Sequence, residues 1–298
     1  MEEDAELIKN FKEAGRIAEL IRKESLKLVI PGQPVLDIAE TLEQMIVENG
    51  GRPGFPVNVS INHIAAHYTP SSDDTTTIND NDIVKIDFGV HINGCISDNA
   101  ITIDLSDEHG DLVEASKLAL DNALSTMRAG KTVGEIGKVI EDTITSKGFK
   151  PIRNLTGHMI RPYQLHAGEI IPNVATEDGY VLKEGDVFAV EPFATTGEGR
   201  VKDCNRIEIY SIAEIKNVRL KKSREIFAYA FEHYFTLPFA RRWLDKIFGS
   251  KVLVSLSLRE LVNADMLYQY PVLEEVKGGL VSQAERTVLI EKDSVTLL

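Results

Sequence analysis

An internal repeat constrains the fold of this chain more than any other feature of its sequence. The segment PGQPVLDIAETLEQMIVENG, which begins at residue 31, recurs as AGKTVGEIGKVIEDTITSKG, which begins at residue 129. A pattern copied at this length predicts two similar halves related by a pseudo-twofold axis. The shared residues lie at a constant offset: Gly32, Val35, Ile38, Glu43, Ile46 and Gly50 recur as Gly130, Val133, Ile136, Glu141, Ile144 and Gly148.

Acidic residues in the strands that follow each copy extend the repeat. Asp87 in DIVKIDFG corresponds to Glu191 in DVFAVEPF. Asp98 in CISDNAITI corresponds to Glu285 in QAERTVLI. A duplicated fold brings such pairs face to face, and like charges that share one site disfavour each other's ionisation unless a cation lies between them. The four carboxylates therefore predict a metal site.

The sequence Asn93-Gly94 predicts a β-hairpin, because both residues tolerate the positive φ of a two-residue turn. With this turn, Asp87 lies opposite Ala100. Asp98 then lies opposite Gly89, so the two acids are diagonal neighbours on one face, about 7–8 Å apart between backbones. A solvated hairpin that tolerates two acids is the alternative, and the second acid pair favours metal. The opposite face is expected to pack through Val84, Ile86 and Phe88.

Histidines supply a candidate nitrogen ligand and candidate acid–base groups. His158, in NLTGHMIRPYQLH, is expected in a loop that enters the same cavity, where we predict that it binds metal. His67 and His166 hold roughly equivalent places in the two halves. We predict that both contact substrate or transfer protons. No function is assigned to the remaining histidines, which are His63, His91, His109 and His233.

Composition and charge exclude several classes of protein. A length of 298 residues suits one large domain or two small ones. The net charge of −13 argues against a protein that binds nucleic acid over its whole surface. Two cysteines provide no disulfide framework, the start MEEDAELIKN lacks the features of a signal peptide, and no apolar run reaches the roughly 20 residues that span a bilayer. We therefore expect a cytoplasmic protein without membrane contact.

Apolar periodicity predicts helices and strands in a repeated order. Strands are indicated by alternating β-branched residues, and the segment 54–82 is typical of a loop because it is rich in Asn, Ser, Thr, Asp and Pro. Helices are predicted at residues 7–29, 34–48, 112–128 and 133–147, and strands at 83–92, 95–105, 187–193 and 206–214.

Residues 217–268 interrupt the repeat, and we predict that they form a helical insert subdomain within a single catalytic domain of residues 1–298. Residues 214–251 hold nine Lys and Arg against four Asp and Glu, which is opposite in sign to the whole chain. We favour a subdomain with an aromatic core and solvated basic residues. Contact with an acidic surface such as RNA or the ribosome, through Lys221, Lys222 and Arg224, is the alternative.

The quoted motifs resemble those of the pita-bread metallopeptidases. The resemblance rests on KIDFG, SDNAIT, GHMIRPYQLHAG, VEPFATTG and QAERTVLI, and it covers nearly the whole chain. NHIAAHYTP and the insert are similar to type 2 methionine aminopeptidases of the archaeal kind. The resemblance implies an α+β pita-bread fold and a monomer. It also implies hydrolytic removal of the initiator methionine from nascent polypeptides, ahead of a small second residue, by water activated between two divalent metal ions.

The resemblance implies roles for the metal-binding residues. Asp87 would bind one ion, and Asp98 and Glu285 would bridge both. His158 and Glu191 would complete the second site, and Glu191 would also accept a proton from the water. The ions would be Co, Mn, Fe or Zn, because four carboxylates and one imidazole suit all of these metals.

Substrate contacts are also implied by the resemblance. His67 and His166 would contact the scissile amide and assist leaving-group protonation. Phe55 and Tyr270 would line the pocket for the methionine side chain. One position departs from the family, whose members commonly carry His where this chain has Arg286. Strand alternation directs Arg286 away from the metal face.

Two rival functions share this fold. An X-Pro hydrolase of the prolidase or aminopeptidase P type would use the same five ligands. The insert, and the lack of the additional N-terminal domain typical of that branch, count against it. A binding protein that has lost catalysis is the second rival, and the presence of all five ligands counts against it.

Overall fold

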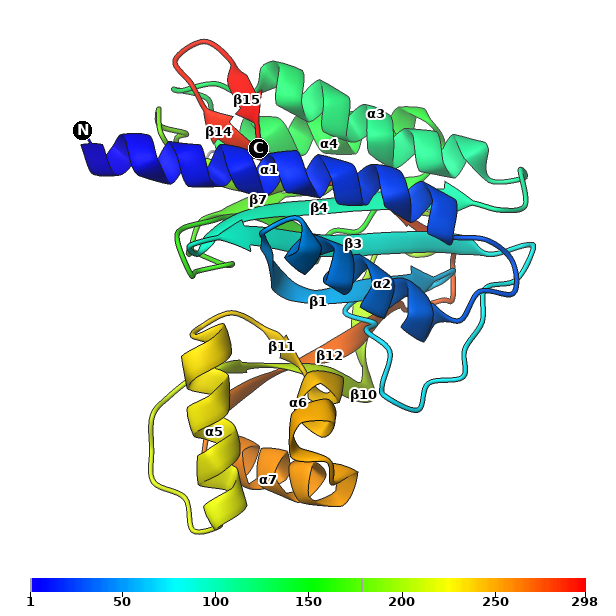
Figure 1. The fold of residues 1–298 in the computed structure, drawn as a ribbon. Helices are drawn as coiled ribbons and strands as arrows, with labels where there is room; N and C mark the ends of the chain where they lie inside the picture. The colour runs from blue at the N-terminus through cyan, green and yellow to red at the C-terminus, as the bar shows by residue number, and fades with distance from the viewer. Residues whose placement is uncertain (1, 178) are drawn as a thin grey trace.

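Each half of the chain combines two helices with antiparallel strands (Figure 1). The computed structural model of the protein describes residues 2–177 and 179–298. The first half contains α1 (Glu2–Leu28), α2 (Val35–Glu48), β1 (Arg52–Ile61), β2 (Ile64–Ala66), β3 (Ile83–Ile92) and β4 (Cys95–Asp104). The second half begins with α3 (Gly110–Thr126), α4 (Val133–Ser146), β5 (Lys150–Pro151), β6 (Thr156–Met159), β7 (Ile170–Pro172), β8 (Val187–Val190), β9 (Phe193–Thr195) and β10 (Val201–Ile212).

A helical segment follows β10, and the chain then returns to the second half. The helical segment contains α5 (Lys221–Tyr234), β11 (Phe239–Ala240), α6 (Arg241–Phe248) and α7 (Lys251–Asn263). The chain ends with β12 (Leu267–Glu275), β13 (Val281–Gln283), β14 (Arg286–Ile290) and β15 (Val295–Leu297).

Backbone geometry confirms the internal repeat. Gly32 and Gly130, which precede α2 and α4, have φ values of 85° and 87°. In the first half the N–H of Gly32 donates to the carbonyl of Ile78, in the loop before β3, at 2.7 Å. In the second half the N–H of Gly130 donates to the carbonyl of Leu182, in the loop before β8, at 2.8 Å. Positive φ is accessible to glycine because it has no Cβ, so the same turn is built twice.

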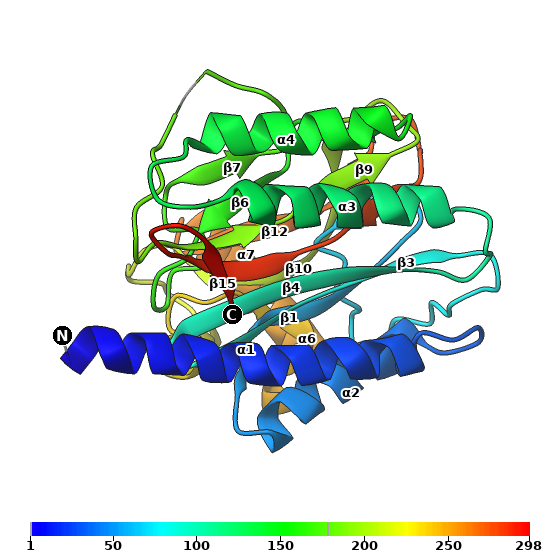
Figure 2. The ribbon, with the colours of Figure 1, turned by 90° about the horizontal axis from the view of Figure 1, so that it is seen from above.

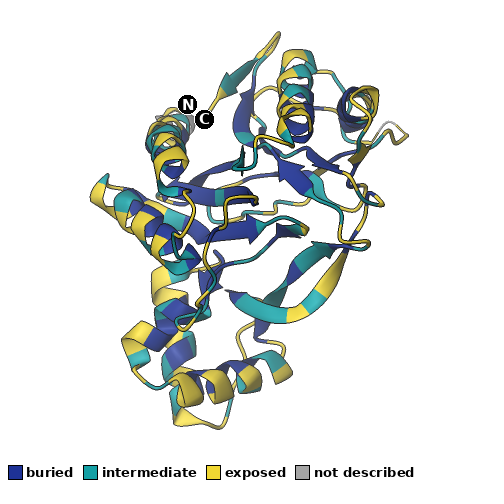
Figure 3. Ribbon diagram, turned by 90° about the vertical axis from the view of Figure 1, so that its right-hand side faces the viewer, coloured by how far each residue is buried: buried dark blue, intermediate teal, exposed yellow. Residues whose placement is uncertain are grey.

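The sheets lie beneath a layer of helices. β1, β3 and β4 form one antiparallel sheet in the order β1-β3-β4, and second-half strands form another in the order β15-β14-β8-β6-β7. Smaller sheets have the orders β13-β9-β5 and β11-β10-β12-β2. α1, α3 and α4 cover one side of the strands (Figure 2). The central strands are largely buried, whereas exposed residues concentrate on the outer faces of the helices (Figure 3).

Each half has its own apolar core. In the first half, α1 and α2 pack against β1 and β3 through fully buried side chains that include Ile17, Leu42, Val59 and Phe88. In the second half, the corresponding cluster includes Ile136, Ile140, Ile144 and Phe188. Val84, Ile86 and Phe88 are all inaccessible to solvent, which confirms the predicted inner face of the hairpin.

Two predictions about the strands were wrong. The segment 54–82, predicted as a loop, contributes most of β1 and all of β2. β1 holds Pro53 and Pro56, and its pairing with β3 shifts register between Pro53 and Phe55 and again between Phe55 and Asn58. Such irregularities accommodate proline, so the turn-forming residues hid a strand. The strand predicted at 187–193 ends at Val190, and β9 begins only after Pro192.

The helical segment has an apolar core and is anchored to the first half by a buried ion pair. The guanidinium of Arg242 in α6 contacts the carboxylate of Glu43 in α2, and Trp243 Nε1 donates to Glu43 Oε2 at 2.8 Å. Glu43 Oε1 also accepts from the N–H of Val57 at 3.0 Å. Arg242 is 1% exposed. The apolar core includes Tyr210, Ile226, Phe239, Leu244, Val254, Leu258 and Leu261.

We predict that Arg242→Met lowers the free energy of unfolding by about 3–5 kcal/mol, because it leaves the buried carboxylate of Glu43 without its cation. Urea denaturation followed by circular dichroism measures the change. Lys246→Met is the matched control, because Lys246 Nζ pairs with Glu40 at 2.7 Å while its own side chain is 57% exposed. Its loss should cost less than about 1 kcal/mol. Equal effects of the two substitutions would contradict the anchoring role of Arg242.

Candidate metal centre

The β3–β4 hairpin places Asp87 and Asp98 as predicted. Ile92 pairs with Cys95 across the turn, Asp87 lies opposite Ala100, and Gly89 lies opposite Asp98. Asn93 and Gly94 have φ values of 50° and 83°, as the turn requires. The two carboxylates therefore project from the same face of the sheet, as diagonal neighbours.

The space beside this face is partly filled by an aromatic ring. Phe55 in β1 lies opposite Gly89, and a Cβ added at Gly89 would come within 2.6 Å of the Phe55 ring. The glycine is therefore required because the ring lies directly over the β3 backbone. The result is an apolar wall next to the two acids.

The second half supplies the remaining candidate ligands. Glu191 directly follows β8, and Glu285 lies between β13 and β14, where its backbone forms a bridge with Ala100 of β4. His158 was predicted in a loop, but it lies within β6 and pairs with Ala189 of β8. This approach depends on Gly157, because a Cβ there would lie 2.4 Å from the carbonyl oxygen of Ala189.

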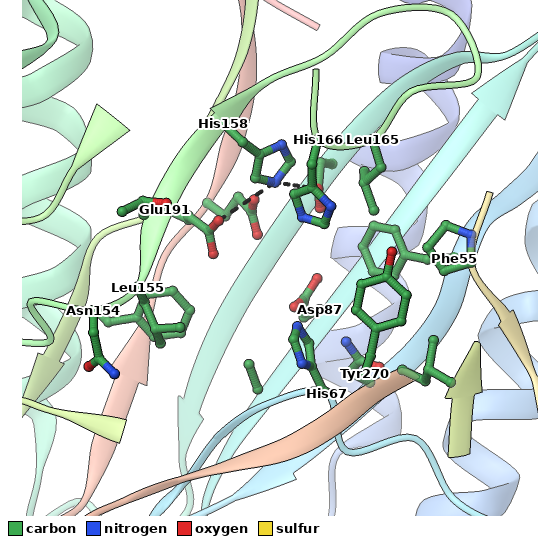
Figure 4. Close-up of a pocket in the computed structure, with 18 residues that line it drawn as sticks. Phe55, His67, Asp87, Asn154, Leu155, His158, Leu165, His166, Glu191 and Tyr270 are labelled. Carbon is green, nitrogen blue, oxygen red and sulfur yellow. Dashed lines mark ion pairs between the residues drawn. The ribbon is translucent and has the colours of Figure 1, made fainter. Parts of the chain in front are cut away.

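The candidate ligands line one cavity, into which Asp87, His158 and Glu191 point (Figure 4). His158 Nε2 lies 3.5 Å from Asp98 Oδ2 and 3.6 Å from Glu191 Oε1. Asp98, His158 and Glu285 each offer a ligand atom, and these atoms lie within 4.8 Å of one another. Asp98, His158 and Glu285 are at most 5% exposed. All five side chains that were predicted to bind metal line the same cavity.

Burial dominates the electrostatics of the four acids. It raises the pKa of Asp87 to about 7, although hydrogen bonds from Asn58 and Gln283 act in the opposite direction. Burial, and then the charge of Asp87, raise the pKa of Asp98 well above its ordinary value. The pKa values of Glu191 and Glu285 are raised in the same way, by burial first and by the neighbouring carboxylates second.

The donor set fits divalent cations. Within the described residues, Asp87 Oδ1 and Asp98 Oδ1 are buried oxygens without a hydrogen-bond donor. A buried acceptor without a donor is costly, and a cation satisfies it. Carboxylate oxygens with one imidazole nitrogen suit several first-row transition metals. Ionised carboxylates in this arrangement are therefore more stable with a bound cation than without one.

Two further histidines line the same cavity. The ring centroid of His166 lies 4.4 Å from that of His158, and the ring of His67 meets that of Tyr270 edge-on at 5.7 Å. His67 Nδ1 lies 3.1 Å from the carbonyl oxygen of Pro271. Burial lowers the pKa of His67. Burial, and then the charge of His67, lower the pKa of His166 to about 4. Both rings are therefore neutral near pH 7.

The cavity has a volume of about 220 Å³ and contains every predicted site residue. Tyr270 and Phe55 lie on one side of it, and Leu155 and Asn154 lie on the other (Figure 4). Its remaining apolar lining is Ala66, Leu165, Phe193, Ile209 and Pro238. The histidines without an assigned function, His63, His91, His109 and His233, do not line it.

Two amide side chains were missed by the sequence reasoning. Asn58 lies opposite Asp87 in β1 and is 2% exposed. Gln283 Nε2 donates to Glu285 Oε2 at 3.1 Å. The position of Gln283, two residues before Glu285 and therefore on the same side of an extended chain, was a usable clue. Asn58 lay in the segment misassigned as a loop, so its register opposite Asp87 was not visible.

Arg286 points away from the cavity, as strand alternation predicted. Its Nη1 donates to Asn99 Oδ1 at 3.1 Å, and its Nη2 donates to Glu19 Oε2 at 2.8 Å in α1. The departure from the family at this position therefore leaves the candidate ligands in place.

Residues 9–233 match metallopeptidase family M24. The chain belongs to this family. It is 49% identical over 286 residues to a methionine aminopeptidase of Pyrococcus horikoshii, a match that covers 96% of this chain and 97% of its relative. The resemblance to archaeal methionine aminopeptidases is thereby confirmed.

Solved structures with the M24 fold superpose on the chain. A thermophilic Arx1 has a TM-score of 0.86 at 20% identity, and the match covers 98% of this chain and 90% of that one. A methionine aminopeptidase of Thermotoga maritima has a TM-score of 0.72 at 22% identity, covering 97% and 95%. The predicted α+β pita-bread fold is confirmed. Among the described residues, no helix is both long enough and apolar enough to cross a bilayer.

The raised acid pKa values predict that the metal-free protein loses stability as pH rises. Asp87 has a pKa of about 7 in the folded chain against 3.8 ordinarily, so between these values the folded state holds a proton that the unfolded state releases. The melting temperature of the metal-free protein should therefore fall from about pH 4 to about pH 7.

Differential scanning calorimetry after chelation measures this trend. Asp87→Asn should have a shallower fall, because the titrating carboxyl is gone. Saturating Mn²⁺ should also remove the fall, because binding requires the carboxylates to be ionised. A pH dependence that is identical in the wild type and in Asp87→Asn would contradict the assigned pKa.

Proposed function

We propose that this chain is a methionine aminopeptidase that uses two divalent metal ions to remove the initiator methionine from nascent proteins, ahead of a small second residue. The observation that carries the proposal is the convergence of Asp87, Asp98, His158, Glu191 and Glu285 beside an apolar pocket. The 49% identical relative that is named methionine aminopeptidase supports the choice of substrate.

The proposed ligand roles follow the resemblance. Asp87 would bind one ion, Asp98 and Glu285 would bind both, and His158 and Glu191 would complete the second site. Bound divalent ions, whether Co, Mn, Fe or Zn, lower the pKa of water and stabilise negative charge on a peptide carbonyl oxygen.

Glu191 is the candidate general base. Its carboxylate lies 3.6 Å from Nε2 of His158, in the cavity that would hold the ions and the attacking water. A carboxylate within hydrogen-bond reach of water can act as a general base. Glu191 would take the proton of the attacking water and deliver it to the leaving amine.

The two neutral histidines have distinct hydrogen-bonding capacities. Because the carbonyl of Pro271 can only accept, His67 Nδ1 carries the proton and Nε2 is the acceptor. We propose that His67 Nε2 accepts from an N–H of the scissile amide. His166 would donate to the peptide carbonyl, where a neutral imidazole stabilises developing negative charge without competing with the cations.

The apolar side of the cavity would hold the methionine side chain. Phe55 and Tyr270 lie there (Figure 4), Ile209 pairs with Tyr270 across β10 and β12, and Pro238 also lines the cavity. A cavity of about 220 Å³ accommodates one flexible side chain beside the metal ligands. We propose that the limited space beyond the scissile bond admits only small second residues.

We also propose that residues 1–298 form a single catalytic domain, cytoplasmic and monomeric, in which residues 217–268 are a helical insert subdomain. The ion pair of Arg242 with Glu43 supports this organisation. Lys222, one of the basic residues considered for contact with RNA or the ribosome, lies 2.7 Å from Glu225 within α5. Such a contact remains an alternative for the insert.

We predict that the Mn²⁺- or Co²⁺-loaded protein releases methionine from Met-Ala-Ser but leaves Met-Leu-Ser and Gly-Pro essentially uncleaved. Chromatographic detection of free methionine measures this preference. Cleavage of Gly-Pro in preference to Met-Ala-Ser would instead identify an X-Pro hydrolase. No cleavage of either peptide by the loaded protein would indicate a binding protein.

Two substitutions test the catalytic roles. His166→Ala should lower kcat/KM for Met-Ala-Ser by about 10²–10⁴-fold, because it removes a donor to the reacting carbonyl. His233→Ala is the matched control, because His233 is exposed and lies outside the cavity. It should leave kcat/KM unchanged. A His166→Ala enzyme with wild-type kcat/KM would contradict the assignment.

A further inference from the structure

Three consecutive residues of β4 are each bonded to the second half of the chain. Ser97 Oγ donates to the carbonyl oxygen of Leu298 at 2.9 Å, and Asn99 Oδ1 accepts from Arg286 at 3.1 Å. Between them, the backbone N–H of Asp98 donates to the hydroxyl of Thr287 at 2.7 Å. The same hydroxyl donates to the backbone carbonyl oxygen of Asp98 at 3.0 Å. The second half of the chain therefore holds the backbone of Asp98, a candidate metal ligand from the first half, and also binds the residues before and after it.

The bonds to Thr287 replace a missing stretch of sheet. β4 and β14 belong to different sheets, and the chain meets β4 at a bridge between Ala100 and Glu285, which directly precedes β14. The N–H of Glu285 donates to Ala100 at 3.0 Å, and the reverse bond measures 3.4 Å. Two residues further along β4, Thr102 Oγ1 donates to the carbonyl of Gln283 at 2.6 Å and accepts from its N–H at 2.8 Å.

The two threonines act in the same way from opposite strands. Each hydroxyl has one hydrogen to donate and lone pairs to accept with, so one side chain satisfies both backbone groups of the facing residue. Thr287 does this for Asp98 and Thr102 does it for Gln283. The bridge between Ala100 and Glu285 lies between these two pairs. We call the three pairs the inter-half seam.

We propose that Thr287 and Thr102 are positioning residues, which set the separation of the Asp98 and Glu285 carboxylates and thereby the affinity of the site for divalent cations. This inference rests on the proposed function, because it assumes that these carboxylates share ions. Asp98 comes from the first half and Glu285 from the second, so their distance depends on what joins the halves. The seam joins them at the ligands themselves.

The burial of the seam supports this role. Thr287 and Asp98 are 0% and 3% exposed, so water cannot replace the hydroxyl if it is removed. A valine at position 287 would leave a buried N–H and a buried carbonyl without partners, and the backbone would have to move to satisfy them. Groups that orient metal ligands typically change metal affinity by about 10–100-fold when they are lost.

The test uses the full-length protein with Co²⁺ as the probe. Thr287→Val should weaken Co²⁺ binding by about 10–100-fold in titration calorimetry and should change the visible absorption of the loaded protein. Thr287→Ser keeps the hydroxyl, so it should restore wild-type affinity and spectrum. Thr102→Val should weaken Co²⁺ binding as well, and it serves as the second variant if Thr287→Val does not fold.

Thr195→Val is the matched control. Thr195 lies outside the seam and is 1% exposed. Its hydroxyl also makes two hydrogen bonds to the backbone: it donates to the carbonyl of Leu280 at 2.7 Å and accepts from the N–H of Gly197 at 3.0 Å. It should lower the melting temperature and leave Co²⁺ affinity and spectrum unchanged. If the folded seam variants bind Co²⁺ as the control does, the threonines are merely structural and the inference is wrong. Wild-type protein that binds no Co²⁺ would instead refute the proposed function.

Discussion

The mutual repulsion of four carboxylates gathered in one cavity is the constraint on which this structure depends. Asp87, Asp98, Glu191 and Glu285 share one cavity, and burial raises the pKa of each. Gathering these charges without water is unfavourable unless cations are bound. The chain nevertheless holds these groups together through strands from two halves, so the folded state carries an energetic cost that is relieved when the carboxyls are protonated or when cations bind.

Duplication explains how one sequence provides such a scaffold. The same glycine turn, with the same hydrogen bond to the following loop, precedes α2 and α4. Each copy brings two acids to the shared cavity: Asp87 and Asp98 lie within β3 and β4, whereas Glu191 follows β8 and Glu285 precedes β14. Neither copy alone supplies more than part of the ligand set. Function therefore arises at the junction, where the Thr287 and Thr102 hydroxyls replace the hydrogen bonds of a continuous sheet.

The parts of the site that local rules govern could be read from the sequence. The Asn93-Gly94 turn fixed the register of β3 and β4, and strand alternation gave the direction of Arg286 correctly. The position of His158 within β6 escaped prediction, because a four-residue strand held by Gly157 has too little periodicity to recognise. Asn58 escaped prediction because its strand was taken for a loop, and Gln283 escaped although its spacing from Glu285 places both on the same side of an extended chain. β1 escaped because its prolines sit at shifts of register.

Glu43 and Glu141 occupy equivalent positions in the two copies of the repeat. Glu43 accepts a hydrogen bond from the N–H of Val57 at 3.0 Å, and Glu141 accepts one from the N–H of Ala175 at 2.7 Å. In addition, Glu43 binds Arg242 and Trp243. The scaffold thus offers two related attachment points, and the helices of residues 221–263 are docked at the first. The cavity is therefore not symmetric: on one side of it Tyr270 of β12 pairs with Ile209 of β10, and both line an apolar wall (Figure 4). Under the proposed function, an apolar first side chain would meet that wall on one side only, so the direction in which a peptide is cleaved would follow from the broken symmetry.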